Sequence, residues 1–453
     1  MTATDDTGTL PWHLTGNRAP TFEERTVTEL EVKGAIPTEL TGRYFRNGAN
    51  PKVGRSEHWF LGDGMVHGIE LAGGKANWYR NRYVRTPMLG RPDSDRMELY
   101  LDPETFTFNY DVSTANTHVL GHNGRIFALE EGAFPYELSK ELDTIGPCDF
   151  DGRLTTAFTA HPKICPETGE MLAFAYSSLP PFLTYHRVDA AGRLVQSTEI
   201  TVTGSTMMHD FAVSRHHSVF MDLPMIFDME LAMQGGMPIR WSDEYPARFG
   251  VMPREGLDAD VRWFDVDPCY VFHTLNAHDE GDEVVVRGCR IKELWRSTSD
   301  IGGGDDAAAM PMMWEWRFNL KTGAVREHQL DDRNSEFPRV PDAKAGLDGR
   351  YGYAMSDTPS GGGHIFKYDF ANGAERSVFD YPRGHRPGEP VFIPAEDGTA
   401  EDDGYLMTYV HAEDTDTSYL SIVDASDLTA EPVAEVHLPF RIPVGFHGSW
   451  IAD

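Results

Sequence analysis

The chain alternates short apolar runs with turn residues, and this pattern predicts many antiparallel strands. Pairs such as Asn123-Gly124 and Ala191-Gly192 come directly before runs that contain β-branched or aromatic residues. Such spacing is typical of tight hairpins in a meander. The expected strands include residues 125–129, 193–195, 283–286, 351–354, 405–410 and 419–423.

Helical periodicity is rare by comparison. The best candidate for a helix is residues 223–234, where Met225, Met229 and Met233 recur at every fourth position. At helical spacing these side chains would form one stripe, which is typical of core packing. Flexible methionines would also suit a pocket for an apolar ligand.

The expected strands continue to the last ten residues, which favours a closed all-β architecture. A β-propeller removes exposed sheet edges economically in a chain of 453 residues. No WD-type or kelch-type motif recurs at a fixed period, so the pattern alone does not select a propeller. The length itself allows one large β domain or two to three average domains.

Charge narrows the partners that the chain can bind. Its 71 acidic and 40 basic residues give a formal charge of −31, whereas binding to nucleic acid or anionic membranes needs clustered Lys and Arg. The first residues have neither a basic nor an apolar segment of a secretion signal, and no run approaches the roughly 20 apolar residues of a spanning helix. The four cysteines form no C-x-x-C pair. We therefore expect a reduced, cytoplasmic protein with no nucleic-acid or membrane partner.

The usual motifs of nucleotide, hydrolase and zinc-protease chemistry are absent from the sequence. It contains no P-loop, no G-x-S-x-G, no G-x-G-x-x-G and no H-E-x-x-H. A redox enzyme with this sequence would therefore work without NAD or flavin.

Four of the 18 histidines stand in distinctive apolar or small-residue contexts: His161, His209, His273 and His447. A buried imidazole must be hydrogen-bonded or metal-bound to avoid a large desolvation cost. Taken singly, each is more typical of a satisfied core histidine; taken together, the four favour a metal site. A competing hypothesis is a site of two histidines and one carboxylate, starting from His278-Asp279-Glu280 or His411-Ala412-Glu413. Both segments are acidic and polar, so we expect surface turns there.

Several segments resemble the carotenoid cleavage oxygenase family, and the resemblance extends along most of the chain. The matching segments are residues 45–51, residues 59–67 with Trp59-Phe60-Leu61-Gly62-Asp63-Gly64, residues 114–117 and residues 445–450. Several such segments in the right order are far more specific than one motif. The resemblance implies a single domain over residues 1–453, folded as a seven-bladed β-propeller with a helical and loop cap over an axial Fe(II) ion.

The same resemblance implies the site residues. The iron ligands would be the four histidines above, and carboxylates behind three of them would fix the imidazole tautomer: Glu131 for His209, Glu336 for His273 and Glu389 for His447. The ordinary alternative for these glutamates is solvated loop charge. Thr117 would lie near the open coordination positions, and Phe60, Phe272 and Phe446 would line a substrate tunnel or simply pack in the core.

Family members use O2 to cleave a C=C bond into two carbonyl products, and the alkene supplies all the electrons. Their substrates are either long polyenes or short phenolic alkenes. Members that cleave lignostilbenes place a lysine immediately before the first of the glutamates, where this chain has Glu130. We therefore expect a carotenoid or apocarotenoid substrate. A phenolic alkene handled by Glu130 and Tyr100 is the alternative, and a non-catalytic binding propeller is a more remote one.

Overall fold

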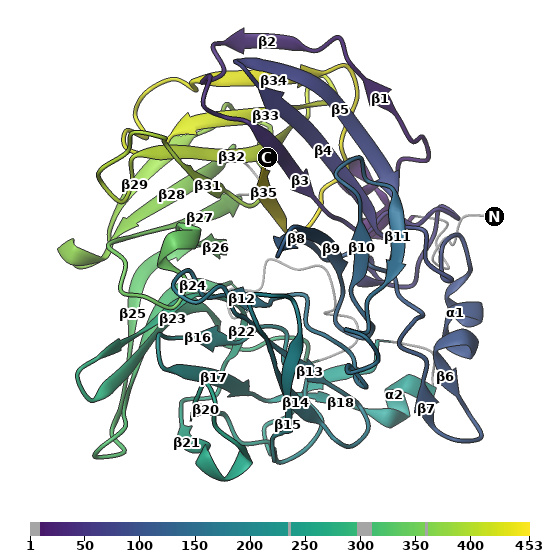
Figure 1. Cartoon of the computed structure of the whole chain (residues 1–453), viewed down its shortest axis with the longest axis vertical. Coiled ribbons are helices and arrows are strands. Elements are labelled where there is room, and N and C mark those ends of the chain that lie inside the picture. The colour runs from purple at the N-terminus through teal and green to yellow at the C-terminus, as the bar shows by residue number, and fades with distance from the viewer. Residues whose placement is uncertain (1–9, 234–236, 297–309, 358–360) are drawn as a thin grey trace. The chain divides into compact units, whose positions relative to one another are not determined.

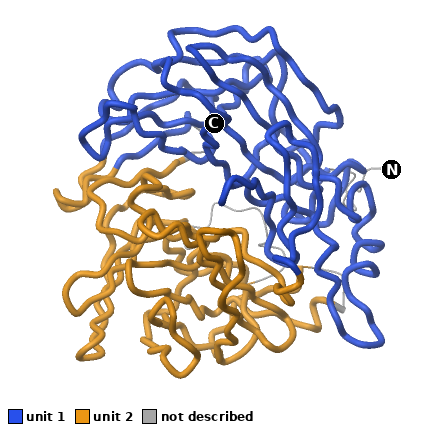
Figure 2. Tube along the Cα trace, viewed as in Figure 1, with its two compact units in different colours: residues 1–151, 357–367, 377–453 blue, residues 152–356, 368–376 orange. Residues whose placement is uncertain are grey.

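The computed structural model describes residues 10–233, 237–296, 310–357 and 361–453. Within these residues the chain is built mainly of short antiparallel strands, and seven sheets have four or more of them. The seven sheets are the blades of a β-propeller, which confirms the predicted fold class. The chain contains two compact units, shown in Figure 2, each made of discontinuous segments. A single domain over residues 1–453 stays a prediction.

The first unit comprises residues 1–151, 357–367 and 377–453. It holds three of the sheets, whose strands are, in spatial order, β1 (Thr26–Val27), β5 (Lys75–Tyr83), β4 (Met65–Ala72), β3 (Gly42–Arg46) and β35 (Gly448–Ala452); β11 (Thr144–Pro147), β10 (Tyr136–Leu138), β9 (Arg125–Leu129) and β8 (His118–His122); and β2 (Glu31–Gly34), β34 (Ala434–Leu438), β33 (Thr417–Asp424), β32 (Gly404–Ala412) and β30 (His385–Pro387), with β31 (Val391–Pro394) also paired to β32.

Strands from the two ends of the chain share sheets in this unit. The C-terminal strand β35 pairs with β3 in the register Arg46↔Gly448, and Figure 1 shows the two strands side by side. Strand β2 similarly pairs with β34 near the C-terminus. Each of these sheets therefore contains strands from both ends of the chain, and this pairing ties the N-terminal segment to the C-terminal one.

The second unit comprises residues 152–356 and 368–376. It holds three more sheets, whose strands are, in spatial order, β12 (Lys163–Ile164), β13 (Met171–Tyr176), β14 (Leu183–Val188) and β15 (Leu194–Glu199); β16 (Ala212–Val213), β17 (His217–Asp222), β20 (Arg248–Pro253) and β21 (Arg262–Asp265); and β22 (Tyr270–Glu280), β23 (Glu283–Ile291), β24 (Met312–Asn319) and β25 (Val325–Asn334). The seventh sheet, with residues assigned to both units, is β26 (Glu336–Arg339), β27 (Tyr351–Asp357), β28 (Gly363–Asp369) and β29 (Glu375–Asp380).

The remaining elements are short. Two further strand pairs are β18 (Met225–Phe227) with β19 (Ile239–Trp241), and β6 (Leu101–Asp102) with β7 (Thr107–Phe108). The helices of the described residues are α1 (Asp93–Tyr100), α2 (Met229–Met233) and single 3-10 turns at Trp12–Leu14, Gly16–Arg18, Trp59–Leu61, Asp258–Asp260, Asp342–Lys344 and Phe370–Asn372. None of them has the length and apolar character that a membrane-crossing helix requires.

The helix predicted over residues 223–234 is wrong for most of its length. Met225 begins strand β18 and is fully buried, whereas Met229 is 56 % exposed at the start of α2. The Asp228 side chain accepts a hydrogen bond from the backbone N–H of Glu230, so the helix starts only there. The methionine spacing therefore does not mark a packing stripe. Gln234 lies outside the described residues.

Candidate metal centre

Four buried histidines lie in or just before edge strands of their sheets. His161 precedes β12, His209 precedes β16, His273 lies within β22 and His447 precedes β35. Each offers one ring nitrogen that could bind a metal ion. An edge strand thus positions each candidate ligand. The four histidines are far apart in the sequence, but each occupies an equivalent place in a different sheet.

The three histidines of the second unit converge through their Nε2 atoms. His161 Nε2 lies 3.0 Å from His209 Nε2, which lies 3.2 Å from His273 Nε2. Imidazole nitrogens bound about 2.1 Å from one ion at right angles are separated by about 3.0 Å. One central imidazole nitrogen can donate only one proton, so hydrogen bonding alone does not satisfy both contacts at once. A shared cation fits this arrangement, and neutral imidazole suits Fe(II).

Glu336 fixes the orientation of His273. Its Oε2 accepts a hydrogen bond of 2.6 Å from Nδ1 of His273, so that Nε2 keeps its lone pair for a metal. The pairing of β22 with β23 shifts register between Val271 and Thr274, the stretch that contains His273. Such irregularities are common next to active sites. The ring of Phe337 stacks on the ring of His273, with centroids 5.2 Å apart.

Glu389 has the same relation to His447 in the first unit. Its Oε1 accepts a 2.9 Å hydrogen bond from Nδ1 of His447, while its Oε2 accepts one of 2.9 Å from the backbone N–H of Gly448. Glu389 is 3 % exposed and His447 is 4 % exposed, so these contacts are shielded from water. This contact keeps the proton of His447 on Nδ1, which is the tautomer in which Nε2 can act as a metal ligand.

The matching sequence segments of the first unit meet around Asn47. The Asn47 side chain donates a hydrogen bond of 2.8 Å to the carbonyl oxygen of Ala115. The backbone N–H of Asn47 donates to the carbonyl oxygen of His447 at 3.0 Å, and the backbone N–H of His447 donates to the carbonyl oxygen of Thr117 at 3.1 Å. The hydroxyl of Thr117 itself donates to Asn116. Three motif segments thus form one hydrogen-bonded frame that fixes the backbone of His447.

Glu131 and Glu130 follow strand β9 in the first unit, beside Tyr100. The pairing of Glu131 with His209 stays a prediction. Burial, with a smaller contribution from the charge of Glu131, raises the pKa of Glu130 to about 7. Burial and the nearby Glu130 also raise the pKa of Tyr100 well above its usual value. The Tyr100 hydroxyl donates to the carbonyl oxygen of Gly132 at 2.7 Å.

The three phenylalanines predicted for the tunnel all contact other aromatic rings. Phe272 meets the His209 ring edge-on at 5.3 Å between centroids. Phe60 and Phe446 lie 6.0 Å apart, and Trp59 lies 4.7 Å from Phe446. These contacts establish packing, and a tunnel lined by them stays a prediction.

The sequence reasoning missed Asp210 and Lys163. Asp210 is 1 % exposed, and its Oδ1 lies 2.7 Å from the Lys163 ammonium. Burial raises the pKa of Asp210, but Lys163, His273 and the backbone N–H of Thr274 together lower it by more, so the net shift is downward. Both residues stand beside candidate ligands in the sequence, in His161-Pro162-Lys163 and His209-Asp210. Their position next to candidate ligands is the sequence feature that could have identified Asp210 and Lys163.

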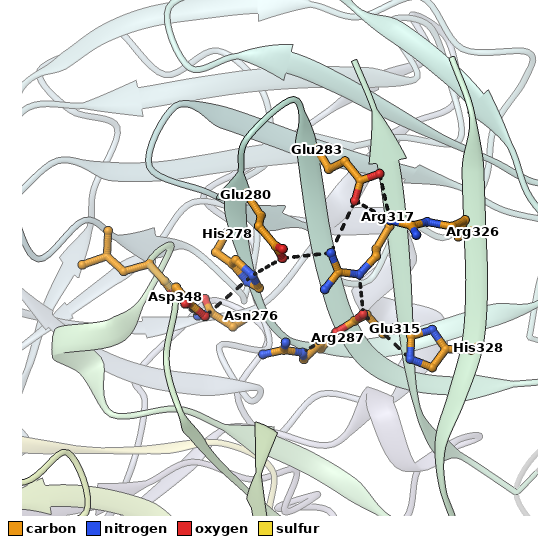
Figure 3. Close-up of polar contacts among 11 residues, drawn as sticks. Asn276, His278, Glu280, Glu283, Arg287, Glu315, Arg317, Arg326, His328 and Asp348 are labelled. Carbon is orange, nitrogen blue, oxygen red and sulfur yellow. Dashed lines mark hydrogen bonds and ion pairs between the residues drawn. The ribbon is translucent and has the colours of Figure 1, made fainter. Parts of the chain in front are cut away.

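The competing motifs do not form metal sites in the described structure. Contrary to the expected surface turn, His278 is a buried residue of β22; its Nε2 lies 3.7 Å from Asp348 Oδ1, and Arg317 binds Glu280 at 2.8 Å (Figure 3). His411 is likewise buried in β32, 3.1 Å from Asp416. Arginine or histidine side chains pair with these carboxylates. The two segments therefore form ion-pair networks and not metal sites.

Comparisons with known proteins place this geometry in a family. The family model described as "Retinal pigment epithelial membrane protein" matches residues 18–452. A "Carotenoid cleavage oxygenase" of Mycobacterium tuberculosis is 40 % identical, with 97 % of each chain covered. An "Isoeugenol monooxygenase" of Pseudomonas putida is 33 % identical, covering 96 % of this chain and 97 % of that protein. The crystal structure of Pseudomonas brassicacearum lignostilbene dioxygenase matches with a TM-score of 0.87 and 29 % identity, over 97 % of this chain and 98 % of that one.

Proposed function

Because the chain belongs to the carotenoid cleavage oxygenase family, we propose that it is an Fe(II)-dependent oxygenase that cleaves an alkene C=C bond with O2 into two carbonyl compounds. The three converging imidazole nitrogens of His161, His209 and His273 support this function most strongly. Neutral nitrogen ligands without a bound carboxylate leave the site with the full charge of the ion, and they suit ferrous iron.

His447 is proposed as the fourth ligand. Its Nδ1 is held by a buried carboxylate in the same way as Nδ1 of His273. In both pairs the glutamate keeps the proton on Nδ1 and raises the basicity of Nε2. Glu131 is proposed to serve His209 in the same manner.

When bound, the ferrous ion would supply O2 activation. The alkene gives up four electrons as its two carbons become carbonyl carbons, and one O2 molecule accepts them, so the overall reaction needs no external reductant. The protein's part is to hold the imidazoles and to exclude water. The phenyl ring of Phe272 beside His209 and the stacked ring of Phe337 beside His273 provide apolar walls for this purpose.

A carotenoid or apocarotenoid is the proposed substrate. Glu130 replaces the lysine that lignostilbene-cleaving members use, and a carboxyl group with a pKa of about 7 can donate to a carbonyl end group when it is protonated. A phenolic alkene is the second candidate, favoured by the similarity to the isoeugenol and lignostilbene enzymes. In that case ionised Glu130 would accept the phenol proton, with Tyr100 beside it.

We also propose a cytoplasmic location. The four cysteines are free and buried in the structure, which suits a reducing compartment.

Product analysis tests this proposal. The iron-loaded protein is incubated in air with a panel of carotenoids, apocarotenals, stilbenes and propenyl or vinyl phenols, and the products are identified by mass spectrometry. Two carbonyl fragments that together contain the substrate carbons are the expected result, with shortened apocarotenals the first expectation and aromatic aldehydes the second. Iron-loaded protein that produces no carbonyl fragment from any of these alkenes would support the non-catalytic alternative.

A further inference from the structure

One buried carboxylate connects the three chain segments that carry the histidines of the second unit. Asp210 follows His209 directly, and its Oδ1 accepts a hydrogen bond of 2.8 Å from the backbone N–H of Phe211. Its side chain is thereby locked against its own segment, so contacts to other segments act on His209 through a single peptide unit.

The first connection runs to the segment of His273. Asp210 Oδ2 accepts two hydrogen bonds of 2.8 Å from Thr274, one from the backbone N–H and one from the hydroxyl. The register of β22 against β23 shifts on both sides of Thr274, so a regular ladder does not fix the backbone at this point. Thr274 is paired with Gly288 between the two shifts, and its bonds to Asp210 hold the backbone one residue from the imidazole of His273.

The second connection runs to the segment of His161. The Lys163 ammonium lies 2.7 Å from Asp210 Oδ1, and Lys163 begins strand β12 two residues after His161. The rigid Pro162 lies between them. Lys163 is 22 % exposed and Asp210 is 1 % exposed, so the contact is largely shielded from solvent.

We propose that Asp210 is a positioning residue that sets the mutual spacing of His161, His209 and His273 through its bonds to Lys163 and Thr274. A buried ion pair contributes little net stability, because desolvation of both charges offsets their attraction. Its effect here lies in geometry: all of its bonds reach residues within two positions of a histidine. The inference rests on the proposed function, since it concerns the same metal ligands.

Asparagine at position 210 keeps the shape of the side chain but cannot keep its bonds. The carboxylate accepts on both oxygens, from Thr274 on one side and from Lys163 and Phe211 on the other. An amide has one acceptor oxygen, and its NH2 group would face a donor in either orientation. Asp210→Asn should therefore break one connection and loosen the spacing of the three histidines.

The test measures Fe(II) affinity anaerobically by competition with a chromogenic chelator, together with the electron paramagnetic resonance spectrum of the ferrous nitric oxide adduct. For Asp210→Asn we expect an Fe(II) dissociation constant about 10- to 100-fold higher, the usual cost of losing a partner behind a ligand, and an altered spectrum. Asp222→Asn is the matched control, since Asp222 is also fully buried in this unit but pairs with Arg248 and Tyr245.

A second pair of variants keeps the inference testable if Asp210→Asn fails to fold. Thr274→Val removes only the hydroxyl donor and should weaken Fe(II) binding about fivefold, the equivalent of one hydrogen bond. Thr274→Ser retains that donor and should match the wild type.

The outcomes separate the inference from the proposed function. Wild-type protein that binds no iron contradicts the proposed function and, with it, the inference. Wild-type protein that binds iron, with Asp210→Asn unchanged in affinity and spectrum, overturns the inference alone. If Asp210→Asn does not fold, equal Fe(II) affinities for Thr274→Val and Thr274→Ser overturn it.

Discussion

Replacement of Glu130 by glutamine should change stability in a way that depends on pH. Burial raises the pKa of Glu130 from an ordinary 4.5 to about 7, so the folded protein holds a proton that the unfolded chain releases near pH 4.5. The contribution of Glu130 to the free energy of unfolding of the wild type is therefore fully present below pH 4.5 and is lost as the pH rises through about 7. Glu130→Gln has no such titration and therefore keeps its stability across this range.

The magnitude follows from the size of the shift. A difference of about 2.5 pKa units corresponds to about 3 kcal/mol, which is an upper limit because the side chain is only partly shielded from solvent. Relative to wild type, Glu130→Gln should thus gain up to about 3 kcal/mol in free energy of unfolding between pH 5 and pH 8.

The assay is urea unfolding followed by tryptophan fluorescence at several pH values. Glu98→Gln, at an exposed position of α1, is the control and should show no such pH dependence. If the stability difference between Glu130→Gln and wild type is equal at pH 5 and pH 8, the raised pKa is contradicted, because the carboxyl group would then be solvated and ionised throughout.

Three further results are expected. Glu389→Gln should weaken Fe(II) affinity about 10- to 100-fold, since the amide is a poorer acceptor for the Nδ1 proton of His447, and an unchanged affinity in the chelator competition would contradict the orienting role. His209→Ala should abolish iron retention by elemental analysis while circular dichroism stays native, and full retention would contradict the ligand assignment. Gly64→Ala should destabilise the protein by about 3 kcal/mol or more in thermal unfolding, because the new Cβ would lie 2.1 Å from the carbonyl oxygen of Ala115. Gly121→Ala is its control, because the new Cβ would meet the flexible end of Ile451 at 3.1 Å and the carbonyl oxygen of Arg125 only at 3.8 Å; equal melting temperatures for both variants would contradict the packing argument.

The sequence predicts strands best where a tight turn precedes them. The expected strand 125–129 is confirmed as β9, and Asn123 and Gly124 before it have φ values of +50° and +72°, which suit a two-residue hairpin turn. The helix expected at 223–234 is wrong because a fourfold methionine spacing is weak evidence when the first part of the segment pairs as a strand. The number of blades followed from the family resemblance, since no fixed-period repeat is present.

Candidate ligands were easier to find than the residues that position them. Histidines in apolar contexts are conspicuous because an unsatisfied imidazole is costly there. Asp210 and Lys163 carry no such mark, since charged residues are abundant and their burial depends on which segments meet in the fold. The bulge at Thr274 is also set by tertiary pairing, and local sequence does not encode it visibly.

X-ray absorption at the iron K-edge of the reconstituted protein measures directly whether four histidines bind the iron. We expect one iron per chain, coordinated by ligands that include four imidazole nitrogens, and the loss of one imidazole in His447→Ala. A first shell dominated by carboxylate oxygen or sulfur, or one that is the same in His447→Ala as in the wild type, would contradict this assignment.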